Sequence, residues 1–188
     1  MDCCDDKISR STNETVNAPF NLSTKDTLIS LDLSKVQKSG LRDSTLEARV
    51  MRVYDGDTLT VAMSINNDSH YEAFQIRLYG CDAPEKKGNT KTCAEAAREE
   101  VLRFIGASGA IGLKRGKQEN TWFQNNPIIV VIKFMSKQQG AIDKYGRELA
   151  HLYKSKNDHE SLSDHLIKTG LAQPYNGGTK DQSMYEDS

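Results

Sequence analysis

The sequence predicts an α+β fold in which a small closed antiparallel barrel of about five strands carries two to three helices. Short runs of β-branched and aromatic residues are separated by turn signals, which is typical of a small β-structure. Two other segments, near residues 92–105 and 160–169, have apolar residues at helical spacing. Closure into a barrel is favoured because it removes exposed strand edges.

A flexible arm, residues 1–44, is predicted to precede the barrel. It is rich in Ser, Thr, Asn, Asp and Lys, and its apolar residues cluster only within Leu28–Val36. Such a segment cannot bury enough apolar surface to fold alone, although Leu28–Val36 could dock a protein partner. The barrel domain is then expected over residues 45–180, with an acidic tail at 181–188.

The first two strands are expected on either side of Asp55-Gly56. This dipeptide is a strong hairpin signal, because a primed turn needs a positive φ that glycine adopts readily. Apolar residues alternate with polar or small ones in Leu59–Met63 and again in Phe74–Tyr79, which predicts strands with one buried face. Pro84 ends the third strand, since proline supplies no N–H to the ladder.

The second half of the chain predicts a helix, two strands and another helix. The first helix stops at Gly106, and the polar stretch 114–127 that follows is interpreted as an insertion. Its Trp122-Phe123 pair either packs the loop down, the commoner case, or stacks a base. Strands are expected over residues 127–134 and 147–153, before the last helix.

Composition excludes several classes of protein. Hydrophobic residues make up 37% of the 188, mean hydropathy is −0.63, and no apolar run is long enough to span a membrane. Acidic residues stand where a signal peptide needs cations, so an intracellular location is expected. The net charge of −1 excludes a generally basic nucleic-acid coat, but residues 45–180 carry 19 basic and 16 acidic side chains, which leaves room for a local basic patch.

Neither the cysteines nor the histidines have the spacing of a metal site, and the cysteines do not form a disulfide framework. Reduced thiols and ordinary surface or hydrogen-bonded imidazoles are expected at Cys3, Cys4, Cys81, Cys93, His70, His151, His159 and His165.

Charged residues interrupt the apolar pattern at three strand ends or turns: Asp55–Thr58, Arg77–Glu85 and Asp143–Arg147. These clusters contain what phosphodiester cleavage requires. A hard cation on oxygen ligands neutralises the phosphoryl oxygens, arginine forks grip them with paired hydrogen bonds, and a further carboxylate orients water. The bias of the residue before Pro84 toward extended geometry could turn the Ala83 carbonyl toward such a cation.

Four stretches, VYDGDTLTV, IRLYGCDAPE, DKYGRELAHLY and LIKTGLAQPYNGGTK, occur in this order over about residues 47–180. They resemble the staphylococcal nuclease (thermonuclease) family. The resemblance implies an OB-fold barrel and calcium-dependent hydrolysis of DNA and RNA. The 114–127 insertion, the arm and the short chain after Lys180 depart from the family pattern.

The resemblance implies roles for nine residues. The expected calcium ligands are Asp57, Asp82 and the main-chain carbonyl of Ala83, the catalytic residues are Arg77, Glu85 and Arg147, and the substrate contacts are Lys144, Tyr145 and Tyr175. Arg77 and Arg147 grip phosphate in this assignment, Glu85 takes the position of the general base, and Tyr175 stacks a base.

Each cluster also has a structural interpretation. Asp55–Asp57 alone is most often a hairpin turn, and Arg77 could pair with a loop carboxylate only to satisfy its charge. The basic clusters Lys86–Lys91 and Lys114–Lys117 are equally consistent with a phosphate track and with a solvated face.

The leading hypothesis is a monomeric calcium-dependent nuclease that prefers single-stranded or frayed DNA and RNA, because a flexible strand reaches a narrow site more easily. The alternatives are a non-catalytic OB-type module that binds nucleic acid or protein, and a scaffold whose arm docks a partner. Non-catalytic relatives typically lack several charged site residues, and none of the nine is missing here.

Overall fold

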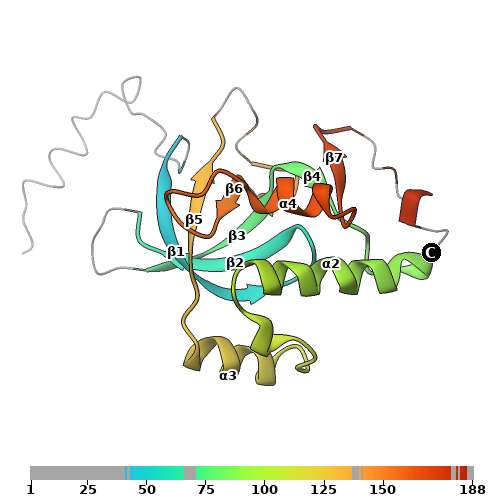
Figure 1. Ribbon diagram of the computed structural model, residues 1–188. Coiled ribbons are helices and arrows are strands. Elements are labelled where there is room, and N and C mark those ends of the chain that lie inside the picture. The colour runs from blue at the N-terminus through green and yellow to red at the C-terminus, as the bar shows by residue number, and fades with distance from the viewer. Residues whose placement is uncertain are drawn as a thin grey trace, which may run out of the picture. The chain divides into compact units, whose positions relative to one another are not determined.

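Five strands of the computed structural model close into a barrel in the order β1-β2-β3-β6-β5 (Figure 1). The structure describes residues 41, 43–65, 71–136, 140, 142–178, 181 and 183–185, which belong to one compact unit, residues 40–188. The barrel strands are β1 (Thr45–Val53), β2 (Thr58–Met63), β3 (Glu72–Leu78), β5 (Ile129–Phe134) and β6 (Glu148–Tyr153).

The predicted α+β barrel is confirmed, with one difference in strand direction. β3 and β6 run parallel, whereas the other barrel pairs are antiparallel. A tight hairpin forces antiparallel pairing, but the long connection from β3 to β6 leaves either direction possible. Outside the barrel, β4 (Gly80–Asp82) pairs with β7 (Gln173–Tyr175) in a small antiparallel sheet that the sequence did not indicate.

Three α-helices are present in the described part of the chain: α2 (Lys91–Phe104), α3 (Lys117–Asn125) and α4 (Leu162–Lys168). Short 3₁₀ turns lie at Gly88–Thr90, Ser108–Ala110 and Ser183–Tyr185. α2 and α4 confirm the two predicted helices. None of these helices is long and apolar enough to cross a membrane.

The β1–β2 hairpin is confirmed, but the predicted reason for Gly56 is wrong. Gly56 is absent from the described glycines with positive φ. It is instead a point of close approach, because a Cβ there would lie 2.7 Å from the Ala83 Cβ and 2.9 Å from the Ala97 Cβ. Gly56 thus lets the hairpin pack against both α2 and the loop after β4.

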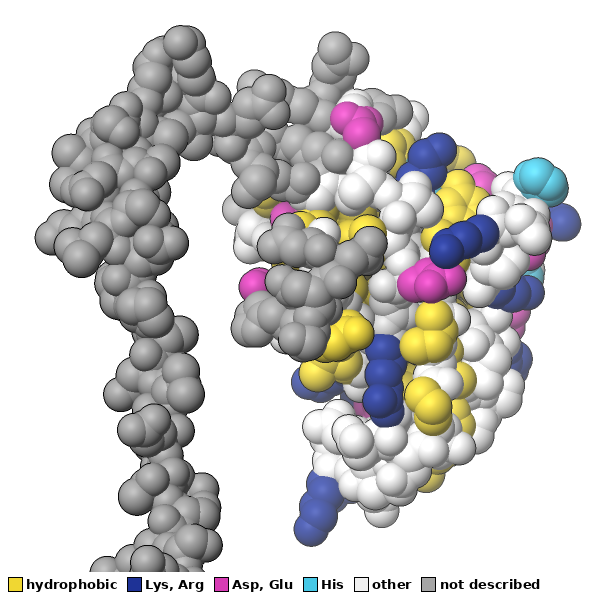
Figure 2. Space-filling view, turned by 90° about the vertical axis from the view of Figure 1, so that its left-hand side faces the viewer, with side chains coloured by type: hydrophobic (Ala, Val, Ile, Leu, Met, Phe, Trp, Pro, Cys, Tyr) yellow, Lys and Arg dark blue, Asp and Glu magenta, His cyan; other side chains and the backbone are white. Residues whose placement is uncertain are grey.

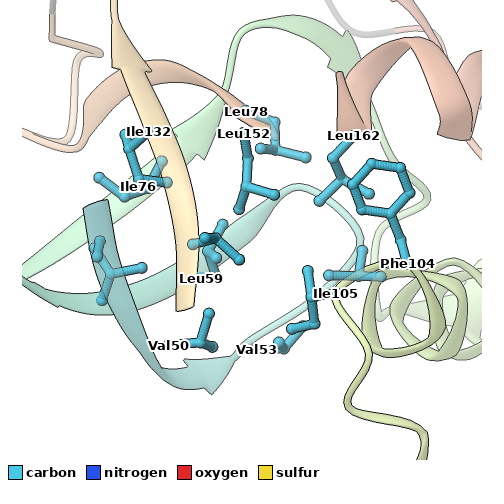
Figure 3. Packing of buried hydrophobic residues seen from close by; sticks show 14 of the residues in the cluster. Val50, Val53, Leu59, Ile76, Leu78, Phe104, Ile105, Ile132, Leu152 and Leu162 are labelled. Carbon is cyan, nitrogen blue, oxygen red and sulfur yellow. The ribbon is translucent and has the colours of Figure 1, made fainter. Parts of the chain in front are cut away.

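One hydrophobic cluster fills the barrel and extends to the helices (Figure 3). Phe104 and Ile105, from the end of α2, and Leu162, from α4, lie beside the barrel residues in that view. Leu41 and Tyr185, which fall within the predicted arm and tail, are both buried. On the face shown in Figure 2, exposed hydrophobic side chains form separate patches with basic ones between them.

The inserted helix α3 lies below the barrel in Figure 1 and is held by a buried ion pair. Glu119 on α3 pairs with Arg98 on α2, and both side chains are at most 2% exposed. Arg98 Nε also donates to the Val53 carbonyl at 3.1 Å. Phe123 belongs to the core and Trp122 packs against it, which fits the packing interpretation of this pair.

Candidate active site

Eight of the nine predicted site residues line one pocket. The structure brings together there Asp57, Arg77, Ala83, Glu85, Lys144, Tyr145, Arg147 and Tyr175. The ninth, Asp82, is fully buried and contacts Arg77, which lines the pocket. Residues from four distant parts of the sequence therefore meet at one place.

Arg77, on β3, lies between the two carboxylates predicted to bind calcium. Its Nη1 is 2.7 Å from Asp57 Oδ2, and its Nη2 is 2.9 Å from Asp82 Oδ1. All three residues are buried. Charges removed from water are normally paired, and here two negative groups share one positive group. The sequence pattern had placed Arg77 on the polar face of its strand; the carboxylates explain its burial.

Asp57 is held by two hydrogen bonds besides this ion pair. The Thr58 hydroxyl donates to Asp57 Oδ1 at 2.9 Å, and the Ala83 backbone N–H donates to Asp57 Oδ2 at 3.0 Å. The register of β2 and β3 places Thr58 opposite Arg77. The hairpin loop and the loop after β4 are therefore joined at the Asp57 carboxylate.

Asp55, two residues earlier, adds a further carboxyl group to the pocket lining. Burial, and next the negative charge of Asp57, raise its pKa to about 6. Its Oδ1 accepts a hydrogen bond from the Asp57 backbone N–H at 3.2 Å. Asp55 therefore adds to the negative potential around Asp57 once it is ionised.

Arg147 is oriented by Asp143 from its own loop. Asp143 Oδ1 accepts from the Arg147 backbone N–H at 2.9 Å, and Asp143 Oδ2 accepts from Arg147 Nε at 2.6 Å. Burial alone would raise the pKa of Asp143, but these bonds outweigh it and lower that pKa. Arg147 Nη1 donates to the Thr58 hydroxyl at 3.0 Å, so a continuous chain of contacts joins Arg147 through Thr58 and Asp57 to Arg77.

The remaining pocket residues are more open to solvent. Glu85 and Lys144 are exposed, and Tyr145 is 73% exposed with its ring 5.5 Å from Arg147 Cζ. Tyr175 is half-buried and donates its hydroxyl to the Gly178 carbonyl at 2.8 Å. These four side chains form the solvent-accessible part of the pocket lining.

Tyr185 reaches the site from the other end of the chain. Its ring is buried, and its hydroxyl donates to the Asp82 main-chain carbonyl at 3.2 Å. Burial, and next the charge of Asp82, raise the pKa of Tyr185 to about 12, so the hydroxyl keeps its proton. Together with the β4–β7 pairing, this bond fixes the strand that carries Asp82.

Sequence reasoning missed the roles of Thr58, Asp143 and Tyr185. Thr58 and Asp143 stand inside the charged clusters, and this position beside Asp57 and Arg147 is the signal that could have identified them. No sequence signal indicated Tyr185, since it lies in a short acidic segment.

No group of three or more His, Cys, Asp or Glu side chains that could hold a metal occurs in the described part of the chain. The predicted calcium shell needs only two such side chains, Asp57 and Asp82, plus a main-chain carbonyl. Buried carboxylates with one arginine between them are hard oxygen ligands with an excess of negative charge, which fits a hard divalent cation. Burial raises the pKa of the Cys81 thiol to about 12.

Comparison with known families decides the relationship. The model of the staphylococcal nuclease homologue family matches residues 75–188. The chain belongs to this family. The match contains Arg77, Asp82 and Arg147 but begins after the hairpin with Asp57, which the structure connects to the matched part through the Arg77 ion pair. No curated protein matched the chain. This staphylococcal nuclease homologue thus has the barrel of a nuclease-type family.

Proposed function

We propose that this staphylococcal nuclease homologue is a calcium-dependent phosphodiesterase that cleaves DNA and RNA, preferentially in single strands. The observation that carries the proposal is the contact chain from Arg147 through Thr58 and Asp57 to Arg77, which places two arginines and the Asp57 carboxylate on one pocket, with the buried Asp82 carboxylate paired to Arg77. Such a set suits a phosphodiester, whose transition state gathers negative charge.

Asp57, Asp82 and the Ala83 carbonyl would hold the calcium ion. When bound, calcium supplies positive charge that neutralises the phosphoryl oxygens. Calcium suits this small set of protein ligands better than magnesium, which demands near-ideal octahedral geometry.

The side chains of this chain would share the remaining work. Arg147 is oriented for gripping phosphoryl oxygens by its bonds to Asp143 and Thr58. Arg77 has both terminal nitrogens on carboxylates, so gripping phosphate requires it to release one of them. Glu85 is exposed on the pocket lining and would orient the attacking water.

The more exposed side chains of the pocket are proposed to contact the substrate. Lys144 and Tyr145 would contact a neighbouring phosphate, and Tyr175 would stack a base. We also propose that the protein acts as a monomer and that the predicted arm docks a protein partner through Leu28–Val36. Leu41 and Tyr185 are buried, so the folded nuclease domain extends somewhat beyond the predicted bounds of 45–180.

The deciding experiment is cleavage of labelled single-stranded DNA and RNA with calcium and with excess chelator. We expect cleavage only with calcium, and none by Asp57→Asn, which keeps the shape of the side chain but removes its charge. Glu47→Gln, at an exposed surface pair with Lys156, is the matched control and should cut normally. Full activity in chelator would exclude calcium.

Calcium binding itself provides a readout without substrate. A ligand that binds only the folded protein at 100 times its Kd adds about 2.7 kcal/mol to the free energy of unfolding. Wild type and Glu47→Gln should show this rise in melting temperature, and Asp57→Asn should not. Binding of DNA without cleavage under every condition would favour the non-catalytic binding module instead.

A further inference from the structure

We propose that Tyr54, together with Arg52, Lys86 and Arg115, forms a second nucleotide subsite that binds the strand flanking the scissile phosphodiester. The inference rests on the proposed function and extends it from a single phosphodiester to a longer single strand. These four residues are called the Tyr54 subsite below.

Tyr54 is an exposed aromatic residue on the lining of the candidate active-site pocket. It follows β1, is 48% exposed, and its backbone N–H donates to the Thr58 carbonyl at 2.9 Å. Thr58 is the residue that links Arg147 to Asp57. The backbone of Tyr54 is therefore held by Thr58, the same residue that contacts Arg147, while the Tyr54 side chain remains half exposed to solvent.

Two cations flank the Tyr54 ring. Lys86 Nζ lies 3.8 Å from the ring centroid, and Arg52 Cζ lies 5.6 Å from it. Lys86 comes from the loop after β4 and also donates to the Tyr54 carbonyl. Arg52 comes from β1 and is half-buried, so its charge is held near the ring.

Arg115 brings the second basic cluster of the sequence to the same place. It lies just before α3 and pairs with Glu95 on α2. Burial first, and then the positive charges of Arg115 and Arg98, lower the pKa of Lys86, while Asp55 and Glu95 act in the opposite direction. Glu95 also lies 3.5 Å from Arg98, whose Nε donates to the carbonyl of Val53, the residue before Tyr54. The Arg115–Glu95 pair therefore brings the 114–127 insertion to the same side of the domain as Tyr54.

An aromatic ring with phosphate-binding cations around it is the chemistry that recognises single-stranded nucleic acid. Bases stack on the ring, and the cations neutralise the flanking phosphates. Internal cation–π contacts account for Lys86 and Arg52 at the Tyr54 ring, but they do not require a further cation, Arg115, on the same side of the domain. Lys144, Tyr145 and Tyr175 enter the pocket from other segments, so the two aromatic groups would hold different nucleotides.

The test is equilibrium binding of a fluorescent ten-nucleotide single-stranded DNA in chelator, where cleavage is not expected. Tyr54→Ala should weaken binding roughly 5- to 150-fold, the range of one base–aromatic stack. Tyr54→Phe retains the ring and should bind within about twofold of wild type. Tyr71→Ala, at an exposed tyrosine outside the pocket, is the matched control and should bind like wild type.

Salt dependence tests the cations separately. Lys86→Gln and Arg115→Gln should each lower the slope of log affinity against log salt by about 0.7, as expected for one phosphate contact on a single strand. An unchanged slope together with normal binding by Tyr54→Ala would overturn the subsite. If Lys86→Gln and Arg115→Gln lower the slope but Tyr54→Ala binds like wild type, the subsite is also overturned, because charge alone would then explain binding.

The outcome separates this inference from the proposed function. If wild type cuts the same DNA in calcium while Tyr54→Ala binds normally, the function stands and the Tyr54 subsite is wrong. If wild type neither cuts nor binds the DNA, the proposed function is wrong, and the Tyr54 subsite, which depends on it, is wrong as well. A melting curve of Tyr54→Ala confirms that the variant is folded, and Tyr54→Phe decides the role of the ring if it is not.

Discussion

At the scale of single residues, one close packing contact at Gly56 helps to position the candidate site. Gly56, Ala83 and Ala97 come from the hairpin, the loop after β4 and α2, and they meet at a point where no side chain larger than a hydrogen fits on residue 56. Ala83 is also the residue whose N–H binds Asp57. Packing at Gly56 and the position of Asp57 are thus coupled.

Gly56→Ala should therefore destabilise the protein by about 1–3 kcal/mol, the usual cost of overpacking a tight contact. Urea unfolding measures the loss. Ala97→Gly alone should cost about 1 kcal/mol as a helix-interior glycine. If the clash is responsible, the double variant loses less than the sum of the two single variants; simple additivity would contradict the explanation.

Arg147→Lys should lower kcat by about 10²–10³-fold while binding of substrate changes little. Lysine keeps the positive charge but has one nitrogen, so it cannot bond Asp143 and Thr58 and still present a fork to phosphate. Single-turnover cleavage beside equilibrium binding at fixed salt separates the two effects. Arg103→Lys, at an exposed pair on α2, is the control. A variant that fails only through lost affinity would remove Arg147 from the catalytic group.

At the scale of elements, two polar side-chain contacts join the helices but differ in burial. Arg98–Glu119 ties α3 to α2 with both partners buried, whereas His165–Glu100 ties α4 to α2 near the surface. Breaking a buried pair leaves an uncompensated charge, while breaking an exposed pair costs little. Removing one partner of the buried pair is therefore expected to cost far more than removing one partner of the contact near the surface.

Glu119→Ala should destabilise the protein by about 3–5 kcal/mol, since it leaves the Arg98 guanidinium buried with less compensation. Glu99→Ala removes the exposed partner of Arg103 and should cost at most about 1 kcal/mol. Chemical denaturation of both variants gives the comparison. Equal losses would show that the Arg98–Glu119 pair has no special weight.

Glu100 should make part of the stability depend on pH. The hydrogen bond from His165, at 2.8 Å, lowers the pKa of Glu100 below its ordinary 4.5. A depressed carboxyl pKa stabilises the fold above the unfolded value, and that contribution is lost as pH falls through the folded value. Glu100→Gln should cost about 0.5–1 kcal/mol at pH 6 and flatten the loss of stability below about pH 4.5. Unchanged acid sensitivity in thermal melts would contradict this role.

At the scale of the whole molecule, the boundary of the folded unit matters for any shortened chain. Leu41 is buried in the core cluster, and the Ser44 carbonyl accepts a hydrogen bond from the Phe134 backbone N–H at 2.9 Å. Both residues lie within the predicted arm. A cut at residue 44 and a cut at residue 40 should therefore behave differently.

Removing residues 1–40 should leave melting temperature and cleavage nearly unchanged. Removing residues 1–44 should cost about 1.5–3 kcal/mol for the lost burial of Leu41. Thermal melts of the two shortened proteins beside the full chain make the measurement. Equal stability of the two would show that Leu41 contributes nothing to the core.

The sequence predicted most of the barrel because strand alternation and helix periodicity are local signals. It could not give the parallel pairing of β3 with β6 or the β4–β7 sheet, which depend on contacts between distant segments. α3 was missed because its helical surface is polar and its buried residues, Glu119 and Phe123, include a charge that only Arg98 makes acceptable.

The candidate site shows the same division. Asp57, Arg77 and Arg147 stand in short motifs and were predicted from them. The bond from Arg147 to Thr58 and that from Tyr185 to Asp82 span most of the domain, and no motif records them. The predicted roles of all nine site residues await the experiments above.

The bond from Tyr185 to Asp82 also has a consequence for protein synthesis. A ribosome makes the chain from its N-terminus at roughly 5–20 residues per second, and domains fold as units once enough of them has emerged. Asp82 is made more than a hundred residues before the tyrosine that holds its carbonyl, and β7 is also late. A nascent chain can form the β1–β2 hairpin and α2 early, but the strand that carries Asp82 is fixed only once β7 and Tyr185 have left the exit tunnel. The proposed calcium ligand Asp82 would thus reach its final position only after Tyr185 has been made.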